Sequence, residues 1–406
     1  RGGSYLVNRL SSLYLFFGAE IVMAASMGIN ESIFNNYLSD TFQMTAEARG
    51  GLEFPRELPG FLVVVFAGIL GALSLTRMGA LAAVVFAAGT AGLGLAGNSY
   101  AFMVAAMLVG SMGMHLIQPI SHSLTIAMSE ENRRGFRLGQ LGGMRTLGTV
   151  LGTGVIWLSF SDEAPQYLPG FLCAAGGGVV AAAIYSRLKV SGVHYRRSFF
   201  VMRRKFWLYY VLEFLFGARK QIFITFGPWV LIHVYGLSPG DIAFLLMLAS
   251  GIGLVFKPVA GWAMDEWGER VVMVGDGLTL TLVCLGYGFA GLFPGGPRVA
   301  LLIAGTCFIL DNLLFALGTG RTVYVSRLAS DPDELTGTLS LGVTVNHIAS
   351  MVIPFWAGLM WKELGFQIVF AAAGALAMLV AGFSWLVPGK GARVPIMGGN
   401  ASALEG

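Results

Sequence analysis

Ionisable side chains occur inside the long apolar stretches of this chain. They are Glu20, Glu31, Arg219, Lys220 and Asp311, the last beside Asn312. A charge in hydrocarbon costs at least ~2.5–3.5 kcal/mol, so it is kept where it faces protein or water. Cations at membrane depth can bind an anionic solute, and carboxylates there can carry protons. The pattern predicts a water-lined path through a membrane.

The spacing of polar residues aligns several of them on common helix faces. Glu20 and Glu31 are eleven residues apart, about three turns at 3.6 residues per turn, and Asn35 follows one turn later. In a later stretch, steps of four, three and four residues align Ser111, His115, Gln118 and His122. We expect both sets to face a central cavity.

The composition excludes a soluble protein. The 406 residues are 55% hydrophobic and 12% charged, with a mean hydropathy of +0.72, whereas soluble domains carry about 25% charged residues. Cys173, Cys284 and Cys307 lie in apolar stretches at no metal or disulfide spacing. The net charge of +4 reflects loop topology, so no nucleic-acid partner is expected.

The apolar runs predict an all-α membrane protein of twelve transmembrane helices in two six-helix bundles. The predicted domains are an N-terminal bundle over 1–187, a basic cytoplasmic linker over 188–205, a C-terminal bundle over 206–387 and a disordered tail over 388–406. The predicted helices cover residues 11–38, 46–75, 79–97, 100–127, 138–160, 167–186, 206–235, 240–264, 270–293, 298–327, 337–361 and 365–387.

Lysine and arginine predict the orientation. The long basic stretch at 186–205 and the loop at Arg133–Arg137 fall on one side of the predicted membrane. Basic loops favour the cytoplasm, so both termini are expected there, in a cell membrane crossed many times. Binding of the basic stretch to anionic lipid headgroups is the other interpretation.

Equal numbers of helices in the two halves suggest an internal repeat. After the eighth predicted helix comes Gly261-x3-Asp265-x2-Gly268-x-Arg270. This stretch resembles the cytoplasmic loop signature of the major facilitator superfamily. The corresponding loop in the first half departs from the signature, with Thr76 at the acidic position and Ala80 at the basic one. Gly148–Gly154 is loosely similar to the glycine-rich fifth helix of the family's antiporters, without its proline.

The resemblance implies that the first, fourth, seventh and tenth helices line a central cavity. The implied substrate-binding residues are Glu31, Asn35, His115, Gln118, Arg219, Lys220, Asp311 and Asn312. The signature implies a latch between helix bundles that forms in one conformation and breaks in another. Its residues are Asp265, Gly268 and Arg270.

The charges predict the function. Arg219 and Lys220, with Lys257 and Arg145 nearby, bias a water-lined cavity toward anionic or zwitterionic solutes. Glu20, Glu31 and Asp311 are the expected proton carriers. We therefore predict a monomeric secondary transporter of a small polar, anionic organic solute that is coupled to protons, has no cofactor and lacks a resident metal.

The sequence is also compatible with other functions. A divalent-metal carrier would use His115, His122, Asp311 and Glu31, and a receptor or scaffold would transport nothing. No nucleotide loop, nucleophile elbow or zinc-protease motif is present, so an enzyme is not expected.

The remaining membrane charges carry expectations of their own. Glu213 with Lys220, or Asp311 with Arg219, could be structural pairs. The charged stretch Glu53–Pro59 contains two prolines, Pro55 and Pro59, which are expected to bend the second helix, and its charges are expected to face an outer vestibule. Arg145 could anchor a helix end, and Arg321 is expected to extend toward the interface. Asn346 and His347 are expected only to support the cavity from behind.

Overall fold

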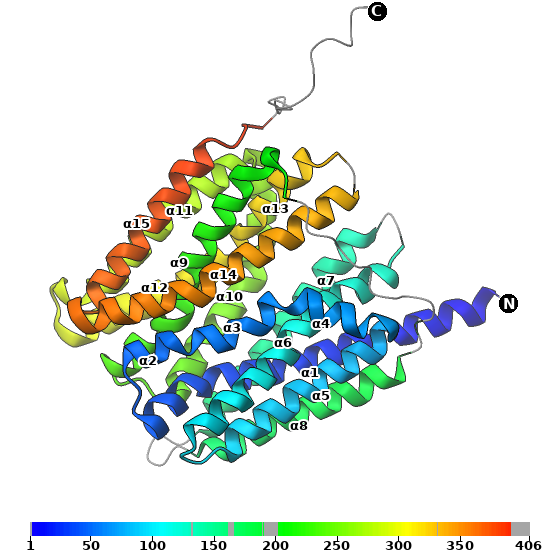
Figure 1. The fold of residues 1–406 in the computed structure, drawn as a ribbon, viewed down its shortest axis with the longest axis horizontal. Coiled ribbons are helices and arrows are strands. Elements are labelled where there is room, and N and C mark those ends of the chain that lie inside the picture. The colour runs from blue at the N-terminus through cyan, green and yellow to red at the C-terminus, as the bar shows by residue number, and fades with distance from the viewer. Residues whose placement is uncertain are drawn as a thin grey trace, which may run out of the picture.

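The computed structural model describes residues 2–130, 133–160, 166–188, 190, 202–330 and 332–390. Most of these residues are helical (Figure 1). The first half contains α1 (Gly2–Phe42), α2 (Ala46–Gly51), α3 (Glu53–Phe61), α4 (Val63–Ile69), α5 (Leu75–Leu95), α6 (Tyr100–Ala127), α7 (Arg134–Ser159) and α8 (Tyr167–Arg187). The second half contains α9 (Trp207–His233), α10 (Pro239–Trp267), α11 (Glu269–Gly288), α12 (Gly296–Leu314), α13 (Thr319–Leu328), α14 (Pro332–Leu364) and α15 (Phe366–Trp385).

The predicted fold is confirmed. Twelve membrane-crossing segments form, the second built from α2 to α4 and the tenth from α12 and α13. Within the described ranges, nine helical segments are long and apolar enough to span a bilayer. The exact limits of the two bundles stay a prediction. Most of the predicted linker and tail, residues 191–201 and 391–406, lies outside the described residues.

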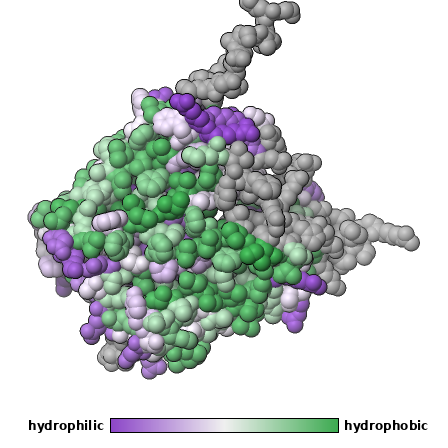
Figure 2. Space-filling view, viewed as in Figure 1, coloured by the Kyte–Doolittle hydropathy of each residue, from purple (hydrophilic) through white to green (hydrophobic). Residues whose placement is uncertain are grey.

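The exterior of the bundles is suited to lipid. Figure 2 shows a mainly hydrophobic face whose hydrophilic residues gather toward the edges. Leu158, Val255 and Leu282 are more than two-thirds exposed, yet all three belong to helices. Helices satisfy their own backbone hydrogen bonds, so such apolar surfaces can contact hydrocarbon directly.

The second membrane segment is broken. Pro59 lies inside α3, which ends at Phe61, and proline cannot donate the backbone hydrogen bond that a continuous helix needs. The predicted bend is therefore present. The expectation that its charges face an outer vestibule is wrong, because Glu53 is fully buried and Glu57 is 5% exposed. The broken segment turns these groups toward the second half of the chain.

The two halves meet where α14 packs against α2 and α3 and where α10 packs against α7 (Figure 1). We call the side of the molecule that holds Gly2 and Trp385 the terminal side, and the opposite side the distal side. On the distal side, Lys362 donates to Glu47 at 2.8 Å, and Asn36 donates to the Leu237 carbonyl at 2.9 Å. The helices approach closely here: a Cβ added at Gly50 would lie 2.2 Å from the Pro354 carbonyl oxygen. The distal side is therefore closed in this conformation.

Gly50→Ala is expected to open that contact. Overpacking costs about 1–3 kcal/mol, which shifts a two-state equilibrium by about 5- to 150-fold. Spin labels at Asn98→Cys and Arg298→Cys, in a chain with the exposed Cys173 replaced by serine, report the distal separation of the halves. Electron–electron resonance should show longer distances in Gly50→Ala.

Gly51→Ala is the matched control for this variant. It makes the same chemical change one residue away, where an added Cβ meets only Phe355 Cδ2 at 4.0 Å. The control should keep the distances of the unmodified chain. Equal distances in both variants would show that the α2–α14 contact does not hold the distal side closed.

Candidate functional site

Three adjoining cavities share lining residues: the first lies within the first half, the third lies within the second half, and the one between them is lined by both. A cavity of about 30 Å³ is enclosed mainly by α1, α3, α5 and α6 and shares Glu31 with a second, of about 80 Å³, whose other lining comes from α9, α10 and α12. The second shares Asn312 and Phe315 with a third, of about 260 Å³, which Lys257 also lines. The shared residues place the three cavities in a row that leads from the first half into the second, and we call this row the path between the halves. Glu31, Asp311 and Asn312 line the second cavity, and their role in binding a solute stays a prediction.

Arginines near the cavities are held by carboxylates. Arg219 and Asp311 form a buried ion pair, and the guanidinium lies 5.5 Å from the centre of the Phe315 ring. The structure therefore brings together the pair suggested for helices seven and ten. Because both charges are 1–3% exposed, the pair is a structural crosslink between α9 and α12 in this conformation.

The other suggested pair does not form. Glu213 accepts from Arg321 Nε at 2.8 Å rather than from Lys220. Arg321 also covers the Phe216 ring at 3.5 Å and is 7% exposed, so the expectation that it extends to the interface is wrong. Its partner is Glu213 because α13 packs against α9.

Glu20 lies in a closed polar cluster on α1. Arg145 Nε donates to it at 2.7 Å, and the hydroxyls of Ser121 and Tyr185 donate to its other oxygen. Glu20 is 1% exposed. Arg145 therefore anchors α7 to α1, and Glu20 borders none of the three cavities that form the path between the halves.

Two lysines, Lys220 and Lys257, are hydrogen-bonded to neutral side chains, unlike the arginines above. Lys220 Nζ donates to Asn346 Oδ1 at 3.0 Å, and Lys257 Nζ donates to Thr146 Oγ1 at 2.9 Å across the two halves. Among the described residues, no carboxylate oxygen lies within 4.0 Å of either ammonium group. Lys257 lines the 260 Å³ cavity, whereas Lys220 lines none of the three cavities and acts on Glu57 through space.

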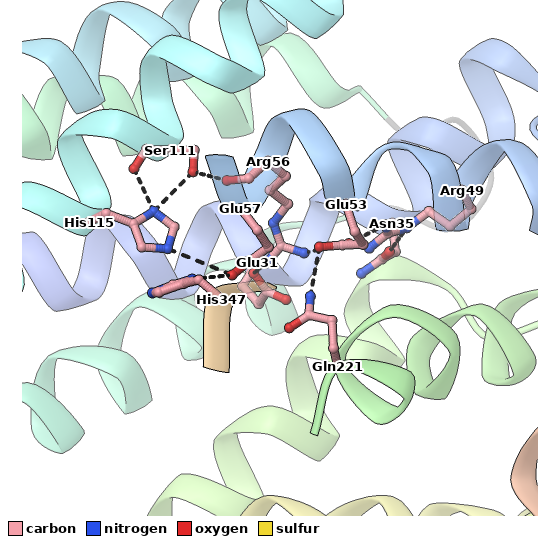
Figure 3. A network of polar contacts seen from close by, with 10 residues as sticks. All are labelled: Glu31, Asn35, Arg49, Glu53, Arg56, Glu57, Ser111, His115, Gln221 and His347. Atoms are coloured by element: carbon pink, nitrogen blue, oxygen red, sulfur yellow. Dashed lines mark hydrogen bonds and ion pairs between the residues drawn. The ribbon is translucent and has the colours of Figure 1, made fainter. Parts of the chain in front are cut away.

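A second polar network surrounds α3 (Figure 3). Asn35 accepts from Arg49 Nε at 2.9 Å, and Arg49 pairs with Glu53. Gln221 donates to Glu53 at 2.7 Å from the other half. Glu31 lies 3.9 Å from Arg56. Asn35 thus supports the α2–α3 turn instead of bordering the cavities.

His115 joins this network from α6. It lies 4.0 Å from Glu57, which accepts from His347 Nδ1 at 2.9 Å. His347 thus has a direct partner and is more than a support behind the cavity. Gln118 and His122, farther along α6, are exposed and do not join the cluster. Sequence reasoning missed Glu57 and His347 as a pair because 290 residues separate them.

Metal binding has one geometric candidate in the described part of the chain. Glu57, His115 and His347 offer one donor atom each within 4.8 Å of one another. The set predicted for a metal carrier is not brought together, since Asp311 is bound to Arg219 and His122 lies outside the cluster. Positive charges on Arg56 and Lys220 act on Glu57 and disfavour a dication beside it.

The loop signature is present at the terminal side. Gly268 ends α10 with φ +84°, a left-handed conformation that favours glycine. Arg270 covers the Trp385 ring at 4.3 Å, while Asp265 is exposed. The neighbouring Glu269, which sequence reasoning missed, pairs with Arg327 of α13 at 3.0 Å. The latch role of Asp265, Gly268 and Arg270 stays a prediction.

The sequence of this chain is similar to those of known membrane transporters. The Major Facilitator Superfamily family model matches residues 15–329. Multi-drug resistance efflux pump PmrA of Streptococcus pneumoniae is 26% identical over 177 residues, which is 42% of this chain and 41% of the pump. The match therefore spans less than half of that relative's length.

Solved structures agree in fold. A mutant of the nucleoside transporter NupG superposes with a TM-score of 0.76 at 12% identity, over 93% of this chain and 99% of that one. The xylose transporter XylE from E. coli gives 0.70 at 15% identity, over 94% and 97%. With the family match over most of the sequence, the chain is a transporter of the Major Facilitator Superfamily.

Proposed function

We propose that this protein is a proton-coupled secondary transporter of a small polar organic anion. The observation that carries the proposal is the pair of lysines without carboxylate partners, Lys220 and Lys257, one of which lines the 260 Å³ cavity. A cation without a carboxylate partner in a low-dielectric, water-lined site attracts an anion strongly.

The arginines support this proposal because, unlike the lysines, they are paired with carboxylates. Arg49, Arg145, Arg219 and Arg321 each have a carboxylate within 3 Å in the described part of the chain. Their charge is balanced locally and is less available to a solute. Of the two cations first predicted to bind the solute, Lys220 keeps this role and Arg219 holds Asp311.

Cavity size restricts the solute. The largest of the three cavities is about 260 Å³, below the ~300–1,000 Å³ typical of sites for drug-sized ligands. A carboxylate or phosphate monoester of a small metabolite fits this volume and would bridge Lys257 to the amide of Asn312.

Direct binding tests the proposal. Thermal stabilisation of the purified full chain is measured with small organic anions, zwitterions, cations and neutral compounds at equal ionic strength. Anions should stabilise the protein, because they bind only the folded state. Stabilisation by neutral compounds or cations alone would contradict the anion assignment.

Glu31 is the proposed carrier of the coupled proton. Glu20 and Asp311 are each hydrogen-bonded to a dedicated arginine, whereas Glu31 is 37% exposed and borders two of the three cavities. It can therefore exchange a proton with the water that enters with the solute. The helix ends on the terminal side are proposed to face the cytoplasm of a cell-membrane monomer, as the basic loops predict.

Glu31→Gln is expected to remove the dependence of solute uptake on a pH gradient. It should spare counterflow of labelled against unlabelled solute, because counterflow needs no net proton movement. Both rates are measured in proteoliposomes, and Asp40→Asn, an exposed acid at the distal end of α1, is the control. Gradient-driven uptake that persists in Glu31→Gln would place the coupling proton elsewhere.

A further inference from the structure

Glu57, His115 and His347 form a cluster that the proposed solute path does not use. Glu57 belongs to α3 and His115 to α6, both in the first half, while His347 comes from α14 in the second (Figure 3). Gly60 makes room for both rings, since a Cβ there would lie 2.4 Å from His347 Cε1 and 2.6 Å from His115 Cδ2. The cluster is therefore built at the contact between the halves.

The hydrogen bonds of His115 fix its tautomer. Ser111 donates its hydroxyl hydrogen to the Arg56 carbonyl oxygen, so its Oγ is left as an acceptor. His115 Nδ1 lies 2.9 Å from the Ser111 carbonyl oxygen and 3.1 Å from that Oγ. Both partners accept, so Nδ1 carries the hydrogen, and the neutral ring presents the lone pair of Nε2 toward Glu57.

Two acceptors consequently face each other. His115 Nε2 and Glu57 Oε2 are 4.0 Å apart in this conformation. One proton placed between them would convert this contact into a charge-assisted hydrogen bond. The same Glu57 oxygen accepts from His347 Nδ1 at 2.9 Å, so the second half occupies the carboxylate while this proton site is open.

Cations of both halves act on Glu57, Arg56 from the first and Lys220 from the second. Arg56, on the first half, is directed to Glu53 at 2.9 Å and to Glu31 at 3.9 Å. Lys220, on the second half, acts on Glu57 electrostatically and has Asn346 as its hydrogen-bond acceptor. The second half thus brings a hydrogen-bond donor and a cation close to the Glu57 carboxylate.

We propose that Glu57 and His115 bind one proton between them when α3 and α14 are apart, and that closing this contact releases it. Closure replaces the proton by the N–H group of His347, so the Glu57 carboxylate keeps a hydrogen-bond donor in both states. This proton site is separate from Glu31 and needs no solute. Binding and release of this proton require only the motion of one half against the other.

Thermodynamic linkage between proton binding and the conformational equilibrium gives the sign of the pH effect. The state with the open distal side binds the proton more tightly, so acid must populate that state at the expense of the closed one. One exchanged proton shifts the equilibrium by up to about tenfold per pH unit. Low pH should therefore lengthen the distance between labels at Asn98→Cys and Arg298→Cys.

The test measures this distance between pH 5 and pH 8 in the full chain, without solute and with a chelator present. The long-distance population should grow as the pH falls in the unmodified sequence. Glu57→Gln and His115→Gln should each remove the dependence. The control His233→Gln changes an exposed histidine outside the cluster and should keep it.

Three results would overturn the proposal. They are a distance that does not change with pH in the unmodified sequence, a change that survives in both Glu57→Gln and His115→Gln, and a pH response that appears only when the chelator is omitted. The last result would assign the cluster to a metal ion. Loss of anion transport with the pH response intact would instead contradict the proposed function and leave this site standing.

Discussion

Replacing both Lys220 and Lys257 by glutamine is expected to abolish anion transport while the protein still folds. Each lysine can give a bound anion a charged hydrogen bond, worth about 1.5–3 kcal/mol, so their joint loss weakens binding by roughly 10²- to 10⁴-fold. Glutamine keeps a donor for Asn346 and Thr146, the present partners. Initial uptake rates and equilibrium binding of the stabilising anion are measured on the same preparation.

Two further variants test whether the loss of transport comes from the loss of positive charge at the site. Arg298→Gln removes an exposed cation at the distal surface and should leave uptake unchanged. Lys220→Arg with Lys257→Arg keeps both charges and should retain measurable binding. Full binding by the double glutamine variant would remove the anion assignment.

The Arg219–Asp311 pair gives the largest expected effect on stability. Arg219→Gln leaves the Asp311 carboxylate, which is 2% exposed, without a countercharge, and breaking a buried pair costs about 3–5 kcal/mol. The double variant Arg219→Gln with Asp311→Asn removes both charges together and should recover most of that loss. Thermal unfolding in lipid nanodiscs measures the three proteins side by side.

The stability regained in the double variant decides between two roles for Arg219. A structural crosslink predicts that the double variant is stable and still binds the anion. If the single variant were as stable as the unmodified protein but failed to bind the anion, Arg219 would itself contact the solute, and the role assigned to the pair would be wrong.

The fold was predictable because membrane helices must be long and apolar. The run Phe366–Trp385 has no charge and forms one continuous helix, α15, as hydropathy predicts. Even the break in the second segment follows from a local rule, since Pro59 cannot donate a hydrogen bond within a helix. These features depend only on neighbouring residues and on the bilayer.

Pairing between helices was less predictable. The sequence places Arg219 and Asp311 at similar depth, and they do pair, but Glu213 selects Arg321 over Lys220. That choice depends on how each helix is rotated about its axis. Packing of α13 against α9 sets this rotation, and helical periodicity within one segment carries no information about it.

The cluster of Glu57, His115 and His347 shows the same limit. Residue spacing alone places His115 in a polar stripe on α6. Its partners come from a helix broken by proline and from a helix of the other half. The close approach of the α2 and α14 backbones at Gly50, and the room that Gly60 leaves for both histidine rings, bring these partners together.

Solute uptake into proteoliposomes under an imposed pH gradient tests the central claim most directly. The purified chain is reconstituted, a small organic anion that stabilises it is added outside, and a pH dye in the lumen follows proton movement. The account predicts that the anion and protons enter together and that an acidic exterior accelerates uptake. Anion uptake with no response to the gradient and no change in luminal pH would contradict proton coupling and leave facilitated diffusion or solute exchange in its place.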